Sequence, residues 1–252
     1  YMPDGGVVVI VAPGDPFRCP PGPYERASLI ANYLKLSKPK SKIVILDAKD
    51  KFSKQPLFQD AWDELYKDMI EWVPGSQGGK VARVDVKTQA VYADNSEHKG
   101  AVINVIPPQK AGALAHTAGL TNETGWCPVD PRTFESKLHP DIHVIGDACL
   151  GGKMPKSGYS AHSQAKVCAA QIAALLIGQP PVDPPWINTC YSLIAPDYGI
   201  TVAAVYRATP EGIVDVQGAG GVSPREAPRS VRAAEAIYAD GWYKSVTADA
   251  FS

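Results

Sequence analysis

The sequence predicts an α/β fold built around a parallel β-sheet, and three observations in the first 50 residues support this. Val7–Ala12 and Lys42–Ala48 are short apolar runs rich in β-branched residues, which is typical of buried strands. Between them, Tyr24–Leu36 carries apolar side chains at helical spacing. A strand, a helix and a second strand in this order form a βαβ unit, in which the strands are parallel and the crossover is right-handed.

The elements that follow in the first half of the chain are a helix and a group of short strands. Phe58–Glu71 has its bulky apolar residues on one face and is predicted to be helical. Val81–Val86, Ala90–Ala93 and Ala101–Ile106 are separated by turn residues, so we expect a small β-meander. Pro107-Pro108 ends the last strand, because proline has no N–H to donate.

The second half of the chain contains fewer and longer elements. Ile142–Ile145 is predicted to be a buried strand, and Ser157–Ile177 a long helix. The proline-rich segment Gln179–Trp186 is the clearest linker of the sequence. We expect a strand at Ile200–Tyr206 and a final amphipathic helix at Ala227–Tyr243.

Composition excludes several classes of function. Lys and Arg number 25 and Asp and Glu 26, which gives a net charge of −1 and no basic field for nucleic acid. No apolar run approaches the ~18 residues that span a bilayer. The five cysteines form neither a CxxC nor a CxxCH motif, and the five histidines are scattered. We therefore expect no metal site and no covalently attached haem on this chain.

The turn after the first strand lacks the glycine pattern of a dinucleotide site. A βαβ unit that binds NAD has G-x-G-x-x-G here, because glycines let the pyrophosphate approach the backbone. The turn Ala12–Gly22 is instead rich in proline, and Asp47 alone stands where a ribose-binding acid would be. These features predict a domain of dinucleotide-binding architecture that no longer binds nucleotide.

Two cysteines are candidates for redox chemistry. Cys19 lies just before the first helix, whose N-terminal dipole is expected to lower the pKa of the thiol, and Glu25 could accept a proton near that sulfur. A buried, inert cysteine is equally compatible with this pattern. Cys190 follows the linker in Thr189–Ser192, and the sequence alone does not pair it with Cys19, since five cysteines allow several connectivities.

The segment that ends at Gly146-Asp147 is typical of a flavin site. Glycine after an apolar strand lets the backbone approach the ribityl–phosphate chain, and the aspartate can accept a hydrogen bond from a ribityl hydroxyl. Downstream, Lys156 and Ser157 open the long helix, whose N-terminus could stabilise negative charge on a reduced isoalloxazine.

Together these stretches resemble the flavoprotein subunit of flavocytochrome c sulfide dehydrogenase. The matching stretches are Phe17–Ala27, Val105–Gly112, Ala118–Asp130, His143–Cys149, Met154–Ala161 and Asn188–Ser192. The resemblance implies a Rossmann-like fold with two dinucleotide-binding domains, of which the N-terminal FAD segment is missing here. It implies three parts: a degenerate NAD-type domain with a β-meander (1–112), the C-terminal portion of the FAD-binding domain (113–179), and an α+β interface domain (180–252).

The resemblance also implies roles for individual residues. Cys19 and Cys190 would form a redox-active disulfide, and Glu25 would be the acid/base residue. The remaining cysteines would be structural. The implied FAD contacts are Pro107, Pro108, Gly146, Asp147, Lys156, Ser157, Tyr159 and Trp242.

The activity implied by the resemblance is the oxidation of hydrogen sulfide to zero-valent sulfur or polysulfide in the periplasm. FAD would accept the electrons and pass them to a c-type cytochrome subunit, which carries the haem. Three alternatives remain at this point: a sulfide:quinone oxidoreductase, an NAD(P)H-dependent disulfide reductase, and an inactive fragment that serves only subunit contacts. The missing glycines argue against the second of these.

Overall fold

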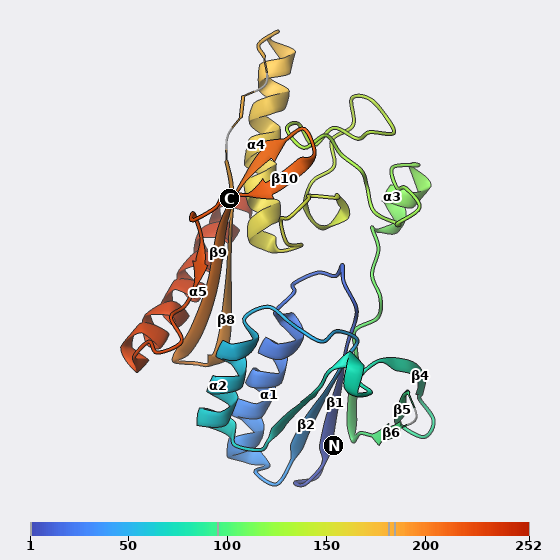
Figure 1. Cartoon of the computed structure of the whole chain (residues 1–252), viewed down its shortest axis with the longest axis vertical. Coiled ribbons are helices and arrows are strands. Elements are labelled where there is room, and N and C mark those ends of the chain that lie inside the picture. The colour runs from blue at the N-terminus through green and yellow to red at the C-terminus, as the bar shows by residue number, and fades with distance from the viewer. Residues whose placement is uncertain (1, 95, 181, 184, 252) are drawn as a thin grey trace.

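The structure is a computed structural model that describes residues 2–94, 96–180, 182–183 and 185–251. Its first part is a four-stranded, fully parallel sheet in the order β3-β2-β1-β7, as the βαβ pattern predicts. The strands are β1 (Val7–Ala12), β2 (Lys42–Asp47), β3 (Ile70–Val73) and β7 (Val102–Val105). The α/β fold class is therefore confirmed, and Figure 1 shows this sheet at the N-terminal end of the molecule.

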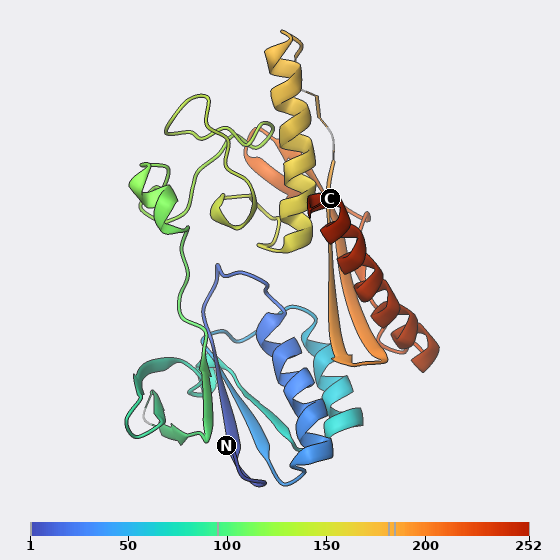
Figure 2. The ribbon, with the colours of Figure 1, turned by 180° about the vertical axis from the view of Figure 1, so that it is seen from behind.

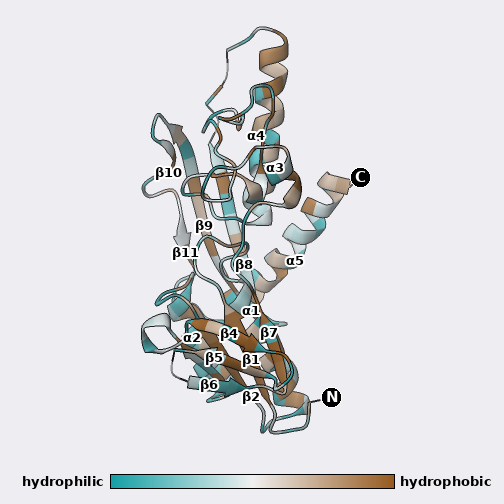
Figure 3. Cartoon of the chain, turned by 90° about the vertical axis from the view of Figure 1, so that its right-hand side faces the viewer, coloured by the Kyte–Doolittle hydropathy of each residue, from teal (hydrophilic) through white to brown (hydrophobic). Residues whose placement is uncertain are grey.

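The alternation of side chains along β1 builds a core on each face of this sheet. Val8 and Ile10 pack against the helices α1 (Gly22–Ser37) and α2 (Gln55–Tyr66). Val9 instead packs with residues of the antiparallel meander β4-β5-β6. The meander strands are Val81–Asp85, Ala90–Ala93 and Ser96–Lys99. Burial on both faces explains why β1 is apolar without interruption (Figure 3).

Three boundaries differ from the sequence prediction. The helix predicted at Phe58–Glu71 ends at Tyr66, and the last two residues of the predicted range, Ile70 and Glu71, belong to strand β3. The strand predicted at Ala101–Ile106 does not belong to the meander, because β7 pairs in parallel with β1. Ile142–Ile145 is not a strand: among the described residues it makes only an isolated bridge from His143 to Glu135. Its apolar side chains lack a neighbouring strand and stay partly exposed, 42% for Ile142 and 37% for Ile145.

The second part of the chain is organised around a long antiparallel hairpin. Its strands are β8 (Trp186–Ala195) and β9 (Tyr198–Thr209), and β9 also pairs with β10 (Gly212–Asp215) and β11 (Gly221–Val222). The short helices α3 (Ala113–Thr117), Gly75–Gln77 and Gly146–Ala148 lie in connecting segments. Pro181 and Pro184 of the predicted linker lie outside the described residues.

This hairpin connects the two main hydrophobic cores. Ile194 and Ile200 at its tip pack into the core of the parallel sheet and its helices. Trp186 and Tyr206 at its open end pack into a second core, to which α4 (Gly158–Leu176) contributes Val167. Cys190 lies between these two ends, and Figures 1 and 2 show the hairpin running from one part of the molecule to the other.

The C-terminal helix α5 (Arg229–Phe251) lies along the hairpin, and a glycine allows its close approach. A Cβ atom at Gly199 of β9 would stand 2.5 Å from the backbone nitrogen of Ala236 in α5. The helix therefore rests directly on the strand at this point, which sets the position of the α5 residues further along, including Trp242.

We expect Gly199→Ala to lower the thermal midpoint of unfolding, because the added methyl group must push α5 off β9. Overpacking of this kind costs about 1–3 kcal/mol. Gly241 of α5 is the matched control, since nothing lies within 4 Å of a Cβ added there. Gly241→Ala should leave stability unchanged or raise it by up to about 1 kcal/mol, because alanine is the better helix former. Equal melting temperatures for the two variants would contradict this account.

Candidate functional site

Cys19 and Cys190, which are far apart in the sequence, line the same cavity. The cavity has a volume of about 430 Å³ and is formed by the loop before α1, the N-terminal turns of α1 and α4, the middle of β8, and α5. Both cysteines are free thiols here, so the structure presents the dithiol form of the pair. The chain therefore brings together the two sulfurs whose pairing the sequence left open.

The backbone around Cys19 directs this loop toward α4. Cys19 has a φ of 53°, in the left-handed region, and its N–H donates a 2.7 Å hydrogen bond to the carbonyl oxygen of Lys156. A Cβ at Gly22 would come within 3.1 Å of the Cys19 sulfur. A glycine at the start of α1 thus leaves room for the thiol.

The expectation of a lowered thiol pKa at Cys19 is wrong for the dithiol form. Desolvation by the surrounding protein, followed by the negative charge of Glu25 and of Cys190, raises the pKa of Cys19 to about 11. Lys54 and the Gly22 amide lower this pKa, but by less. Because desolvation and the acidic neighbours together outweigh the groups that lower this pKa, the pocket favours a protonated thiol or a disulfide over a free thiolate.

Cys190 is held by an asparagine that the sequence analysis did not single out. The amide Nδ2 of Asn188 donates to the Cys190 sulfur at 3.3 Å. Its carbonyl oxygen accepts hydrogen bonds from the hydroxyls of Ser157 at 2.6 Å and Ser160 at 3.1 Å. Asn188 is only 3% exposed, so the two serines of α4 fix the orientation of its amide toward the sulfur.

Glu25 contributes the only carboxylate from α1 to the wall of this cavity. Its Oε1 accepts a 2.7 Å hydrogen bond from the backbone N–H of Leu193. Burial raises the pKa of Glu25, while this hydrogen bond and the charge of Lys54 oppose the rise. A carboxyl group with a raised pKa beside two thiols is suited to accept a proton from sulfur.

Aromatic side chains also line this cavity. Tyr159 of α4 stacks on Trp242 of α5, with ring centroids 5.6 Å apart and an interplanar angle of 14°. Tyr191, next to Cys190, lies 6.4 Å from Trp242 between ring centroids. The structure therefore places Tyr159 and Trp242 beside the two thiols, and Ser157 lines the same cavity.

Gly146 and Asp147 lie beside the start of α4 and have features that fit a flavin. The Oδ1 atom of Asp147 is buried and has no hydrogen-bond partner among the described residues. Gly146 has a φ of +69°, where glycine is favoured, and a Cβ there would stand 3.3 Å from that of Ala161. The unpaired carboxylate oxygen could accept a hydrogen bond from a ribityl hydroxyl. The adjacent glycine turn has no side chain and leaves space for the ribityl chain.

Lys156 and the two prolines lie outside the dithiol cavity. The Lys156 ammonium donates to the carbonyl oxygens of Asp147 and Cys149, at 2.8 and 2.9 Å. Pro107 and Pro108 are exposed in the segment after β7. The residues that follow them, Gln109 and Lys110, contact Arg18, which the sequence analysis missed.

Arg18 connects three segments of the chain. Its backbone N–H donates to Oε1 of Gln109 at 2.9 Å, and its guanidinium donates to the carbonyl oxygen of Lys110 at 3.2 Å. The Nε atom of Arg18 lies 3.5 Å from Oδ2 of Asp147. The segment around Pro107-Pro108 is thereby tied to the loop that carries Cys19 and to the turn that carries Asp147.

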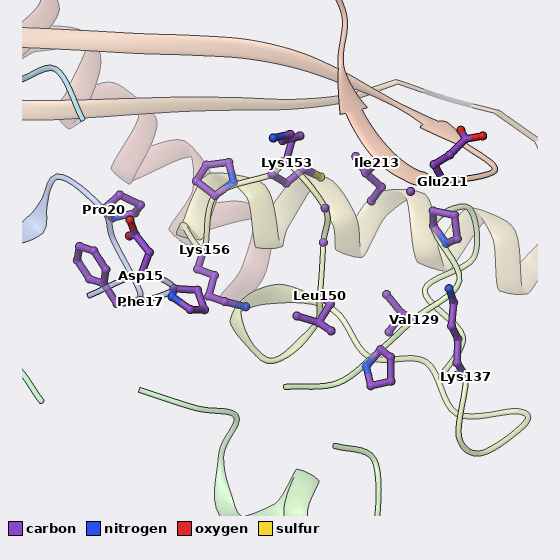
Figure 4. Close-up of a pocket in the computed structure, with 18 of the residues that line it drawn as sticks. Asp15, Phe17, Pro20, Val129, Lys137, Leu150, Lys153, Lys156, Glu211 and Ile213 are labelled. Atoms are coloured by element: carbon purple, nitrogen blue, oxygen red, sulfur yellow. The ribbon is translucent and has the colours of Figure 1, made fainter. Parts of the chain in front are cut away.

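A second, larger cavity lies on the other side of the Cys19 loop. It has a volume of about 750 Å³, and Figure 4 shows Lys137, Lys153 and Lys156 among the side chains that surround it. No cysteine lines it, so it is separate from the dithiol chemistry. Within the described part of the chain, no cluster of His, Cys, Asp and Glu could hold a metal ion.

The nucleotide position of the parallel sheet is occupied by the protein itself. Asp47, at the end of β2, is fully buried. Its carboxylate accepts hydrogen bonds from Tyr24 and from the Trp72 indole, the latter at 3.0 Å, and pairs with the Lys49 ammonium at 2.6 Å. The carboxylate that would bind a ribose is therefore already engaged, which supports the interpretation of this domain as a degenerate nucleotide fold.

Comparison with solved structures shows the same fold. A chain of the Tetrahymena thermophila mitochondrial ATP synthase is 19% identical, with a TM-score of 0.57 over 80% of this chain and 51% of that chain. The Escherichia coli flavoprotein disulfide reductase RclA is 18% identical, with a TM-score of 0.51 over 82% of this chain and 43% of that one. A pyridine nucleotide-disulfide family oxidoreductase from Enterococcus faecalis is 8% identical, with a TM-score of 0.50 over 92% and 60%. The chain spans roughly half the length of these proteins.

Fold and sequence together define the class of protein as a flavoprotein. Two family models match the chain. "Sulfide dehydrogenase [flavocytochrome c] flavoprotein chain, central" matches residues 1–107, and "Flavocytochrome c sulphide dehydrogenase, flavin-binding" matches residues 182–251. The chain belongs to the family of flavocytochrome c sulfide dehydrogenase flavoproteins, which confirms the resemblance seen in the sequence. In the described residues, no helix combines the length and the apolar character needed to cross a bilayer.

Proposed function

We propose that this chain carries the sulfide-oxidising dithiol of a flavocytochrome c sulfide dehydrogenase. The observation that supports it most directly is the cavity that Cys19, Cys190 and Glu25 line together with aromatic side chains. In this proposal the two cysteines form a disulfide in the resting enzyme, and the dithiol seen here is its reduced form.

Cys19 is the sulfur that takes the substrate. It lines the dithiol cavity and also a second hollow of about 520 Å³ along α1, beside Arg26 and Ile30, whereas Cys190 lines only the first of these. Hydrosulfide approaching along α1 meets Cys19 first. Attack of HS⁻ on this sulfur breaks the disulfide and leaves a persulfide, Cys19–S–SH, and a thiolate on Cys190.

The electron pair leaves when the disulfide forms again. Glu25 takes the persulfide proton, and Cys19–S–S⁻ with the Cys190 thiolate then gives the disulfide, zero-valent sulfur and two electrons. The net change is HS⁻ to sulfur, one proton and two electrons. FAD, when bound, supplies the acceptor for this electron pair.

The residues of this chain that would hold FAD are those around the start of α4. Asp147 offers its unpaired carboxylate oxygen, and Gly146 offers space for close approach. Tyr159 and Trp242, stacked on each other, line the cavity that contains the two sulfurs. Ser157 lines the dithiol cavity, and Pro107, Pro108 and Lys156, which lie outside it, complete the proposed cofactor contacts.

The electron acceptor in this proposal is a c-type cytochrome subunit that carries the haem. The family name supports a cytochrome partner, and the sequence given contains no CxxCH motif for haem attachment. A stable redox disulfide is consistent with the periplasm, where thiols are oxidised. We therefore place the protein there.

An anaerobic spectroscopic experiment tests this function. Sulfide added to the FAD-loaded protein is expected to bleach the flavin absorbance, and oxidised cytochrome c is expected to restore it. Restoration by a soluble quinone but not by cytochrome c would support a sulfide:quinone oxidoreductase instead. Bleaching by NADH and not by sulfide would contradict the proposal, and protein that never retains flavin would support a role in subunit contacts alone.

A further inference from the structure

Lys54 is a buried lysine that the sequence analysis did not single out. It is the residue before α2 and has a φ of 61°, in the left-handed region that lysine rarely adopts. It is only 7% exposed, although Lys49 and Lys51 on the same loop give this segment the composition of a solvated surface. A long charged side chain is rarely buried to this degree without a specific partner.

The Lys54 ammonium reaches across to the β8–β9 hairpin. Its Nζ donates hydrogen bonds to the carbonyl oxygen of Cys190 at 2.7 Å, to Oγ of Ser192 at 2.8 Å and to the carbonyl oxygen of Ile200 at 3.3 Å. All three acceptors are uncharged. Among the described residues, no carboxylate oxygen lies within 4.0 Å of this Nζ. The cation is therefore fully hydrogen-bonded, and no carboxylate among the described residues is in direct contact with it.

The acidic groups that face Lys54 are those of the dithiol site and one from the C-terminal helix. Burial lowers the pKa of Lys54 to about 8, and four groups oppose this shift: Cys190, Glu25, Cys19 and Glu235 of α5. Glu235 already has partners of its own, since it pairs with Arg232 at 3.4 Å and accepts a hydrogen bond from Ser223. Glu25, Cys19 and Cys190 remain to balance the Lys54 charge, and of these three the two cysteines acquire negative charge when the disulfide opens.

We propose that Lys54 is a positioning residue whose charge stabilises the Cys190 thiolate when the disulfide between Cys19 and Cys190 is opened. The ammonium is anchored to the backbone of the cysteine that becomes negative, in surroundings of low dielectric where one charge has a large effect. Lys54 takes no part in bond making; it compensates the negative charge that forms on Cys190. Its role in turnover rests on the proposed function, whereas its effect on the thiol does not.

Alkylation of the reduced chain tests this inference without any turnover. The rate of iodoacetamide labelling at Cys190 is followed against pH by mass spectrometry, because only the thiolate reacts. In Lys54→Gln and Lys54→Met we expect labelling near pH 8 to be about tenfold slower, because a nearby positive charge favours the thiolate and these variants remove it. Lys54→Arg keeps the charge and should restore the rate. Lys51→Gln removes an equal charge from an exposed position and should label like wild type.

The glutamine variant separates charge from structure, because its amide can still donate to the hairpin. A well-folded Lys54→Gln protein with the wild-type pH profile at Cys190 would overturn the inference. If no neutral variant folds, the reciprocal effect is measurable in the wild-type chain. A thiolate must raise the pKa of Lys54 as much as Lys54 lowers that of the thiol. Acetylation of Lys54 by acetic anhydride near pH 9 should therefore be slower in the dithiol form than in the disulfide form, and equal rates would overturn the inference.

Sulfide oxidation measured in parallel keeps the two proposals apart. If the Lys54 variants show slower labelling at Cys190 but the wild-type chain oxidises no sulfide, the proposed function is refuted and the role of Lys54 stands. Normal sulfide oxidation without any labelling shift in the variants refutes the role of Lys54 alone.

Discussion

Cys190→Ser is expected to abolish sulfide-dependent reduction of cytochrome c. A serine hydroxyl cannot form a disulfide with Cys19. The bond that hydrosulfide must break in the first step is therefore missing. Loss of a covalent nucleophile lowers turnover by on the order of a thousandfold or more. Cys19→Ser should have the same effect, and the double variant should be no worse than either, because the two sulfurs act as one unit. The measurement is steady-state cytochrome reduction by sulfide.

Cys168→Ala is the matched control for these variants. Cys168 is buried in the core between α4 and the hairpin and does not line the dithiol cavity. Its replacement should cost some stability and little turnover, and the retained flavin spectrum of each variant shows that the site is intact. Residual sulfide oxidation in Cys190→Ser near the wild-type rate would refute the disulfide mechanism.

Glu25→Gln is expected to lower sulfide oxidation by about a hundredfold or more, the typical contribution of a general acid/base residue. Burial raises the pKa of Glu25, so the carboxylate that accepts the proton is populated only above that raised value. Wild-type turnover should fall as pH drops through it, and this limb of the pH profile should be absent from the variant. Steady-state rates across pH measure both effects.

Glu25→Gln is expected to lower activity but not the stability of the fold. A carboxyl group whose folded-state pKa is raised binds more protons in the native than in the unfolded state between the two pKa values, so ionisation destabilises the fold as pH rises. Glutamine cannot ionise, and its oxygen can still accept the hydrogen bond from Leu193. We therefore expect the variant to melt no lower than wild type at neutral pH. A large drop in melting temperature together with the loss of activity would indicate a structural role.

The sheet was predictable where local pattern and final environment agree. The strands β1 and β2 are apolar because both of their faces are covered. The apolar run in the sequence and the burial in the structure therefore both indicate a buried strand. Ile142–Ile145 has equal apolar character but no neighbouring strand, and a strand requires pairing that no local pattern encodes. The partner of β7 was missed for the same reason: its own residues do not say whether it joins the meander or β1.

The site was predictable in its reactive groups and not in the groups that support them. Cysteine beside a helix start is recognisable in a sequence, and the family resemblance named the second sulfur. Asn188 and Lys54 carry no such signal, because a polar residue in a strand and a lysine among lysines are ordinary surface patterns. Only the packing of the hairpin against α1 and α4 shows that both are buried and aimed at Cys190.

The contacts at the end of β2 bear on whether a nicotinamide coenzyme could bind and reduce this protein. The Asp47 carboxylate accepts hydrogen bonds from Tyr24 and Trp72 and pairs with Lys49. Tyr24 also stacks on Phe52, with ring centroids 3.6 Å apart. A nicotinamide coenzyme could dock there only by unpacking these aromatic rings. Because the Asp47 carboxylate is already engaged, the proposed thiol chemistry would take its electrons from sulfide and not from a nicotinamide bound at this end of the sheet.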